Sequence, residues 1–141
     1  MNLRAAVVDT NAVVAGLLTA EGGAPTAGIL DGMRRGAFPF VLSAALLAEY
    51  HEVLLRPRIR RLHGLAEREI DLLLTEIARH AIVREPEPAS GASDPKDNHL
   101  WALVLSTPGS VLVTGDLALA RRPPPGSEAL SPREFADALA R

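Results

Sequence analysis

The sequence predicts a three-layer α/β/α sandwich around a central parallel sheet. Short apolar runs that end in polar residues alternate along the chain with longer segments in which apolar residues recur every three or four positions. The first pattern is typical of buried strands and the second of amphipathic helices, so their alternation indicates an α/β layered fold. Its 141 residues, 48% hydrophobic and 23% charged, are ordinary for one globular domain, which we expect to span residues 1–141.

The first half of the chain is predicted to hold two strands and three helices. Its strands are short apolar runs, one stopped by Asp9 and the other by Ser43. Glycine and proline at 22–25 separate the first two helices, and Pro57 ends the third because proline disfavours helix at the preceding residue. In order, we expect a strand over 3–8, helices over 11–19 and 25–35, a strand over 38–42 and a helix over 44–56.

The second half continues the alternation after a basic connection, RPRIRRLHG, at 56–64. The proline-rich stretch EPEPASGASD is predicted to be a loop, because no independent core lies beside it, and RRPPPGS a stiff loop. A proline at the first turn favours the terminal helix. In order, we expect a helix over 66–79, a strand over 81–83, a helix over 95–105, a strand over 111–113, a helical turn over 117–120, a strand over 129–130 and a helix over 132–139.

Composition excludes several classes of site and location. The chain has no cysteine, which removes disulfides, thiolate metal sites and a cysteine nucleophile. No apolar run approaches about 18 residues, so we expect no transmembrane helix and no membrane partner. The N-terminal segment MNLRAAVVDTN lacks the form of a signal peptide, and a cytoplasmic location is therefore expected. The net charge of −2 argues against a strong attraction of the whole protein to nucleic acid.

Carboxylates gather at the predicted carboxyl ends of the strands. Asp9 follows the first strand, Asp116 follows the fourth, and Asp94 and Asp97 open the helix between them. Ligands bind beyond the carboxyl ends of the strands in sheets of this kind. Each aspartate taken alone is also a good helix cap, so capping is the competing interpretation.

Glu49 does not fit a capping role. It lies on the border of an apolar helical stripe, between Leu46 and Val53, whereas Glu52 points towards solvent. A carboxylate at the edge of a buried face needs a partner, and the other acids would repel it. A divalent cation resolves this conflict, because Mg²⁺ prefers oxygen ligands and activates water for phosphodiester hydrolysis.

Four segments in series, VVDTNAVVAGLL, LSAALLAEYHEVLLRP, SDPKDNHLWALVL and VLVTGDLAL, resemble the PIN domain over nearly the whole chain. The nearest likeness is to the small VapC-like ribonucleases that act as toxins in toxin–antitoxin systems. The resemblance implies the same three-layer fold and a Mg²⁺- or Mn²⁺-dependent endoribonuclease that cleaves single-stranded RNA. It also implies a catalytic, metal-binding quartet, namely Asp9, Glu49, Asp97 and Asp116.

The third metal ligand could be either Asp94 or Asp97. We favour Asp97, because it lies inside the first helical turn while Asp94 is the more natural cap. Neutral polar side chains at the same edge are candidates to orient a water molecule or a phosphate oxygen. For each of them a turn or capping hydrogen bond is the alternative. These supporting candidates are Asn11, Thr114, Ser43 and Asn98.

Arginines supply the candidate contacts to the RNA backbone, because the guanidinium fork matches phosphate. A solvated basic face is an equally good interpretation, and no aromatic stripe for base stacking is visible. The four histidines share no metal-ligand spacing. His99 follows Asp97 and could approach the site, but we favour a place at the surface or between helices, and we expect Trp101 in the core or an interface. The candidate RNA-binding residues are Arg56, Arg58, Arg60, Arg61, Arg121 and Arg122.

The resemblance further implies protein partners. A cognate antitoxin would cover the active site, and a homodimer is expected, with the helix over 66–79 as one possible surface. Two alternative functions stay open. One is a non-catalytic PIN-like domain that binds RNA or protein. The other is a Mg²⁺-dependent phosphatase of the haloacid dehalogenase type, which needs a second aspartate where this chain has Asn11.

Overall fold

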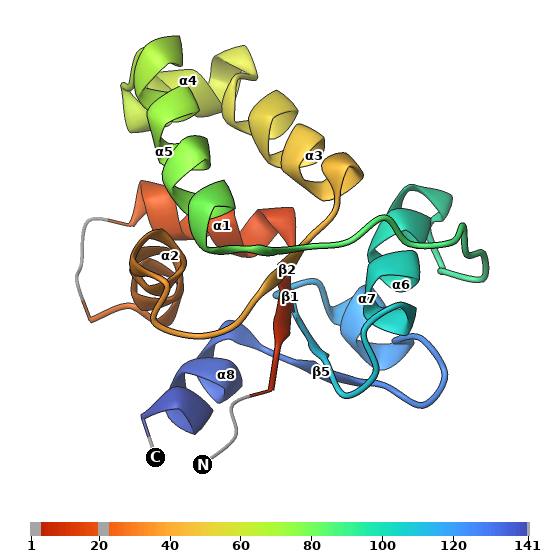
Figure 1. Cartoon of the computed structure of the whole chain (residues 1–141). Coiled ribbons are helices and arrows are strands. Elements are labelled where there is room, and N and C mark those ends of the chain that lie inside the picture. Colours follow the sequence, from red (N-terminus) through yellow and green to blue (C-terminus); the bar gives the residue numbers. More distant parts are fainter. Residues whose placement is uncertain (1–3, 20–22, 141) are drawn as a thin grey trace.

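The computed structural model describes residues 4–19 and 23–140 (Figure 1). The predicted start of the first strand at residue 3 and the glycine at 22 lie outside these residues. Within the described ranges, no helix has both the length and the apolar character that crossing a membrane requires.

The central sheet is parallel throughout the described chain. One ladder has the order β1-β4-β5, a second pairs β2 with β3, and a parallel bridge between Ala6 and Phe40 joins the two. The resulting spatial order is β3-β2-β1-β4-β5. The strands are β1 (Ala6–Val8), β2 (Val41–Leu42), β3 (Ile82–Val83), β4 (Val111–Val113) and β5 (Glu128–Leu130).

Helices cover both faces of this sheet, which confirms the three-layer α/β/α prediction. In Figure 1, α6 and α7 lie on one side of the strands, and α1, α2 and α8 lie on the other. A 3₁₀ turn, η1 (Pro95–Asp97), leads directly into α6. The helices are α1 (Thr10–Leu18), α2 (Pro25–Arg35), α3 (Ala44–Leu54), α4 (Pro57–His63), α5 (Glu67–His80), α6 (Asn98–Leu105), α7 (Leu117–Arg121) and α8 (Pro132–Leu139).

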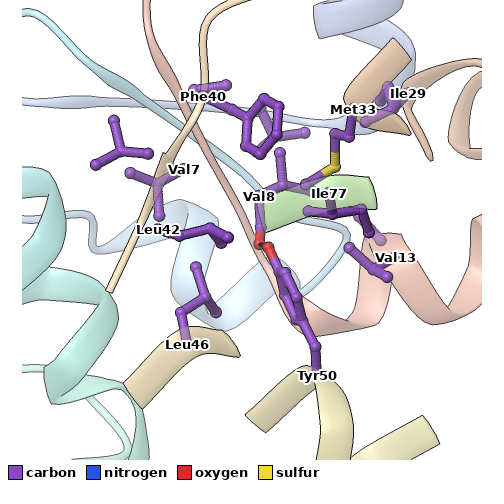
Figure 2. Packing of buried hydrophobic residues seen from close by; sticks show 14 of the residues in the cluster. Val7, Val8, Val13, Ile29, Met33, Phe40, Leu42, Leu46, Tyr50 and Ile77 are labelled. Carbon is purple, nitrogen blue, oxygen red and sulfur yellow. Dashed lines mark hydrogen bonds between the residues drawn. The ribbon is translucent and has the colours of Figure 1, made fainter. Parts of the chain in front are cut away.

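The two central strands, β1 and β4, are buried on both faces, as their unbroken apolar runs predict. Figure 2 shows Val7 and Val8 of β1 packed among side chains from the helices, including Met33 and Leu46. At the far end of the sheet, Phe135 of α8 meets Phe38 edge-on, with the ring centroids 5.1 Å apart. This core holds the carboxyl ends of β1 and β4 in fixed positions.

One predicted connection is wrong: residues 57–63 of the basic segment form the helix α4. Pro57 ends α3, but it also stands in the first turn of α4, where a proline needs no N–H partner. Gly64 ends the helix with a left-handed φ of 68°, a conformation that glycine adopts without strain. His63 Nε2 donates to the carbonyl oxygen of Leu54 at 2.9 Å, which ties α4 to the end of α3.

The strand order creates a crevice between β1 and β4. The chain leaves β1 towards β2, and it leaves β4 in the opposite direction towards β5. Neighbouring parallel strands whose connections diverge in this way leave an opening at their carboxyl ends, which is where α/β proteins bind ligands. The segments that follow β1 and β4 therefore frame the candidate site.

Candidate active site

Asp9 leaves the carboxyl end of β1 and stands at the N-cap position of α1. Its side chain turns to Thr114, whose Oγ1 donates to Asp9 Oδ2 at 2.7 Å. Asp9 is only 5% exposed. Burial raises the pKa of Asp9, the hydrogen bond from Thr114 opposes that rise, and the negative charge of Glu49 adds to it. Asp9 is therefore a buried acid at the crevice, oriented by a neighbour rather than by a capping bond.

Thr114 joins the segments that follow β1 and β4. It is buried at the end of β4, and its hydroxyl donates to Asp9 while accepting the backbone N–H of Asp116 at 3.0 Å. Thr114 therefore contacts both acidic segments of the crevice. Its hydroxyl holds Oδ2 of Asp9 towards the protein and also holds the backbone N–H of Asp116 in place.

Glu49 reaches the same region from α3 and is held at both oxygens. Thr10 Oγ1 donates to Glu49 Oε1, and His99 Nε2 lies 2.8 Å from Glu49 Oε2. The next residue, Tyr50, is fully buried, and its hydroxyl donates to the carbonyl oxygen of Val8 at 2.5 Å (Figure 2). This bond anchors α3 to the end of β1 and so sets the distance of Glu49 from the crevice.

The hydroxyl of Tyr50 is a permanent donor in this arrangement. Burial raises the pKa of Tyr50 well above its ordinary value, and the negative charges of Asp9 and Glu49 raise it further. The phenol therefore stays protonated at physiological pH and keeps its bond to β1.

Asp97 has a strongly raised pKa. Its pKa is raised to about 6, first by burial and then by the charges of Asp9, Asp94, Asp116 and Glu49. Within the described residues, its side chain accepts no capping hydrogen bond. Repulsion from these neighbours indicates that the acids face a common region, with Asp97 among them.

Asp94 and Asp116 both cap helical turns. Asp94 Oδ1 accepts the N–H of Lys96 at 3.0 Å, and Asp116 Oδ1 accepts the N–H of Ala118 at 2.9 Å. Asp116 also raises the pKa values of Asp9 and Asp97, so it contributes charge to the crevice as well as a cap. Asp97 differs from both in having no capping bond, and the choice between Asp94 and Asp97 as third ligand stays a prediction.

The donor set fits a hard divalent cation. All the acidic groups offer carboxylate oxygens, the ligands that Mg²⁺ and Mn²⁺ prefer, and a cation would relieve the repulsion that raises the pKa of Asp97. In the part of the chain that the structure describes, no three His, Asp or Glu side chains lie close enough to hold one ion together. Mg²⁺ tolerates this, because it keeps several waters and binds through one or two carboxylates.

The other supporting candidates serve the fold more than the crevice. Ser43 Oγ accepts the N–H of Leu46 at 3.1 Å and caps α3. Asn98 Oδ1 accepts the N–H of Ala92 at 3.1 Å and holds the proline-rich loop against α6. Asn11 is exposed on the first turn of α1. Thr114 is thus the candidate that contacts an acidic side chain directly.

The candidate RNA-binding arginines form two separate groups. Arg58, Arg60 and Arg61 are exposed on α4, while Arg121 and Arg122 are exposed at the end of α7, and Figure 1 shows these helices at opposite sides of the molecule. Arg56 is 3.1 Å from Glu52, one helical turn earlier. The structure therefore does not bring the six arginines into one surface.

The sequence reasoning missed Thr10 as a residue of the site, and it raised His99 without identifying its partner. Thr10 follows Asp9 directly, and a hydroxyl there is a signal that could have been weighed. His99 packs between helices, as expected, but its contact with Glu49 spans 50 residues and has no local signature. Trp101 is 6% exposed and belongs to the core, as predicted.

The sequence matches a family model described as PIN domain over residues 5–118. A comparison with curated proteins finds no match. PIN domains are typically nucleases that act on RNA and generally use divalent metal ions, which agrees with the oxygen-rich donor set at the crevice. The matched region contains every acidic residue described above and more than half of the chain. The chain therefore belongs to the PIN domain family.

Proposed function

We propose that this protein is a Mg²⁺- or Mn²⁺-dependent endoribonuclease that cleaves single-stranded RNA and acts as the toxin of a toxin–antitoxin pair. The observation that carries the proposal is the acidic crevice, where the charges of Asp9, Asp94, Asp116 and Glu49 act together on Asp97. Acidic groups that oppose one another's ionisation favour the binding of a cation, and a divalent cation beside a phosphodiester is the chemistry of hydrolytic nucleases.

The roles of the residues follow from their contacts. Asp9 and Asp97 would hold the cation, which would keep several waters, Asp116 would contribute negative charge nearby, and Thr114 orients Asp9. Thr10 and His99 hold Glu49 at the rim, from which it orients water. When bound, the cation activates water and neutralises charge at the phosphate. Water would attack phosphorus in line, the bond between phosphorus and the 3′ oxygen would break, and the proton lost by water would be balanced by one taken up at the 3′ oxygen, which leaves a 5′ phosphate and a 3′ hydroxyl.

The partners in this proposal are an RNA strand, an antitoxin and a second copy of the chain. Arg121 and Arg122 follow Asp116 closely and are the arginines best placed to meet a phosphate at the crevice. An antitoxin would act by covering the acidic residues. The apolar stripe of α5, considered above as a dimer surface, packs inside the domain, so a homodimer would use another surface.

The test is cleavage of a mixed-sequence single-stranded RNA by the purified protein with Mg²⁺, with Mn²⁺ and with EDTA. The Asp9→Asn variant should lose cleavage but keep its fold, because asparagine still offers Thr114 an acceptor oxygen. Asp94→Asn is the matched control and should cleave, since asparagine also caps a turn. Cleavage that persists in EDTA or in Asp9→Asn would refute the proposed mechanism.

One observation favours a second candidate, a PIN-like domain that binds RNA or protein without cleaving it. Both oxygens of Glu49 already have protein partners, which leaves fewer free oxygens for a cation. Calorimetry with Mn²⁺ separates the candidates: metal binding without cleavage points to a selective nuclease that lacks its substrate, whereas no metal binding favours the non-catalytic domain. The phosphatase hypothesis has less support and requires a phosphorylated intermediate at Asp9.

A further inference from the structure

A hollow of about 330 Å³ lies beside the acidic crevice. The start of α3, the proline-rich loop and the start of α6 enclose it, with Ser43, Ala45, Pro86, Pro88, Asn98 and His99 among the lining residues. Its volume is at the lower end for protein ligand sites, which suits a small planar group better than a peptide helix.

The lining chemistry selects a neutral group rather than a phosphate. Among the described residues that form the hollow there is no lysine or arginine, and the lining includes the carboxylate of Glu85. A phosphate would meet repulsion there without a compensating cation. The walls are mostly alanine and proline, which offer flat apolar contact to an aromatic ring system.

The polar groups of the hollow can form hydrogen bonds with the edge of such a ring. Ser43 Oγ already accepts the N–H of Leu46, so its own hydroxyl hydrogen is available to donate. Asn98 accepts a backbone N–H through Oδ1, which leaves its amide NH₂ as a donor. Glu85 can accept from an exocyclic amino group. Donors and an acceptor around flat walls match a nucleobase.

His99 connects the hollow to the crevice. It is one of the residues that line the hollow, and its Nε2 lies 2.8 Å from Glu49 Oε2. An occupant of the hollow is therefore separated from the acidic residues by about one side chain. A base and the phosphate next to it in an RNA strand are separated by one sugar, so a strand can place a base here and a phosphate at the crevice.

We infer that this hollow binds one nucleobase of the single-stranded RNA, adjacent to the cleaved phosphate. The inference rests on the proposed function, and it assigns to the hollow the selection of the cleavage site. Aromatic and apolar contacts to single bases are the usual means of recognising unpaired RNA.

The chain offers a matched pair of variants to test this. Ala45 and Ala48 are both exposed on α3, but Ala45 lines the hollow and Ala48 lines a different groove, between α3 and α5. Ala45→Trp should fill the hollow, with Ala45→Leu filling it in part, while Ala48→Trp adds the same side chain elsewhere. Thermal melts confirm that each variant is folded.

Binding is measured by fluorescence anisotropy of a labelled single-stranded RNA, with every variant built on the non-cleaving Asp9→Asn background. Ala45→Trp should raise Kd about tenfold, the effect of losing one base contact. Ala45→Leu should raise it less, and Ala48→Trp should leave it unchanged. On the wild-type background, Ala45→Trp should raise KM with little change in kcat and weaken the base preference at the cut site.

Equal Kd values for Ala45→Trp and Ala48→Trp, or no RNA binding by any variant, would overturn the inference. Cleavage by the wild-type protein decides the proposed function separately. If the protein cleaves RNA but Ala45→Trp changes neither the Kd nor the preference at the cut site, the proposed function stands and the inference of a base site is wrong.

Discussion

Replacing Asp97 by asparagine should stabilise the metal-free protein at neutral pH. Burial first, and then the charges of the neighbouring acids, raise the pKa of the Asp97 carboxyl to about 6. At neutral pH the folded protein must therefore keep Asp97 ionised against burial and repulsion, whereas the unfolded chain ionises it freely. Asparagine has nearly the same shape and carries no charge, so it removes the repulsion and keeps the packing.

The magnitude follows from the pKa difference between the folded and unfolded states. A rise from 3.8 to about 6 corresponds to about 3 kcal/mol at roughly 1.4 kcal/mol per pKa unit. Much of Asp97 contacts solvent, and screening reduces the effect to about 1 kcal/mol. Between the two pKa values the folded state binds more protons, so the wild-type free energy of unfolding falls as pH rises from about 4 to about 6.

Urea unfolding in EDTA at pH 4 and at pH 7.5 measures this. Asp97→Asn should exceed the wild type by about 1 kcal/mol at pH 7.5, and the difference should largely vanish at pH 4, where wild-type Asp97 is protonated in the folded protein. Asp137→Asn is the control, because Asp137 is exposed on α8 and is not among the acids whose charges raise the pKa of Asp97, and its stability should match the wild type at both pH values. An Asp97→Asn variant that is less stable at pH 7.5, or equally stabilised at both pH values, would refute the reasoning.

Three further variants test the contacts that organise the site. Thr114→Val should lower the free energy of unfolding by about 2 kcal/mol, because buried Asp9 loses its donor, and Thr114→Ser should restore it in the same urea titration. Tyr50→Phe should cost about 1 kcal/mol by thermal unfolding, a cost that persists to about pH 10 because the raised pKa of Tyr50 keeps the hydroxyl protonated. His99→Leu should lower kcat for RNA cleavage about tenfold with little change in Mn²⁺ binding by calorimetry, because Glu49 loses one of the two partners that hold it in place to orient water, and His99→Gln should retain more of the activity.

The fold could be predicted because each central strand is an apolar run that needs no context to recognise. Val111–Val113 is buried on both faces, and its boundaries were expected correctly. The helix α4 could not be found in this way. Pro57 signals the end of one helix and the start of the next with the same residue. The contact from His63 back to Leu54 depends on a tertiary arrangement that local sequence does not encode.

The position of the acidic residues followed from topology, but their roles did not. Any aspartate after a strand suits both a cap and a site, and side-chain rotamers decide between the two. In the structure Asp94 and Asp116 accept backbone N–H groups, while Asp9 turns to Thr114. The partners of Glu49 lie 39 and 50 residues away in the sequence, so spacing could not reveal them.

The protein supplies hydrogen-bond donors to some carboxylates of the crevice and not to others. A cation would contribute most at the carboxylate that lacks such a donor. Asp9 has a hydroxyl donor in Thr114, and Glu49 has two donors, so part of their negative charge is already compensated. Asp97 has no such donor among the described residues, and its pKa is raised to about 6, first by burial and then by the charges of the other acids. The buried end of β1 and the bond from Tyr50 hold Asp9 and Glu49 in place. In the function proposed above, a bound cation would relieve the remaining repulsion, and Asp97 would gain most, so we propose that Asp97 couples metal binding to stability.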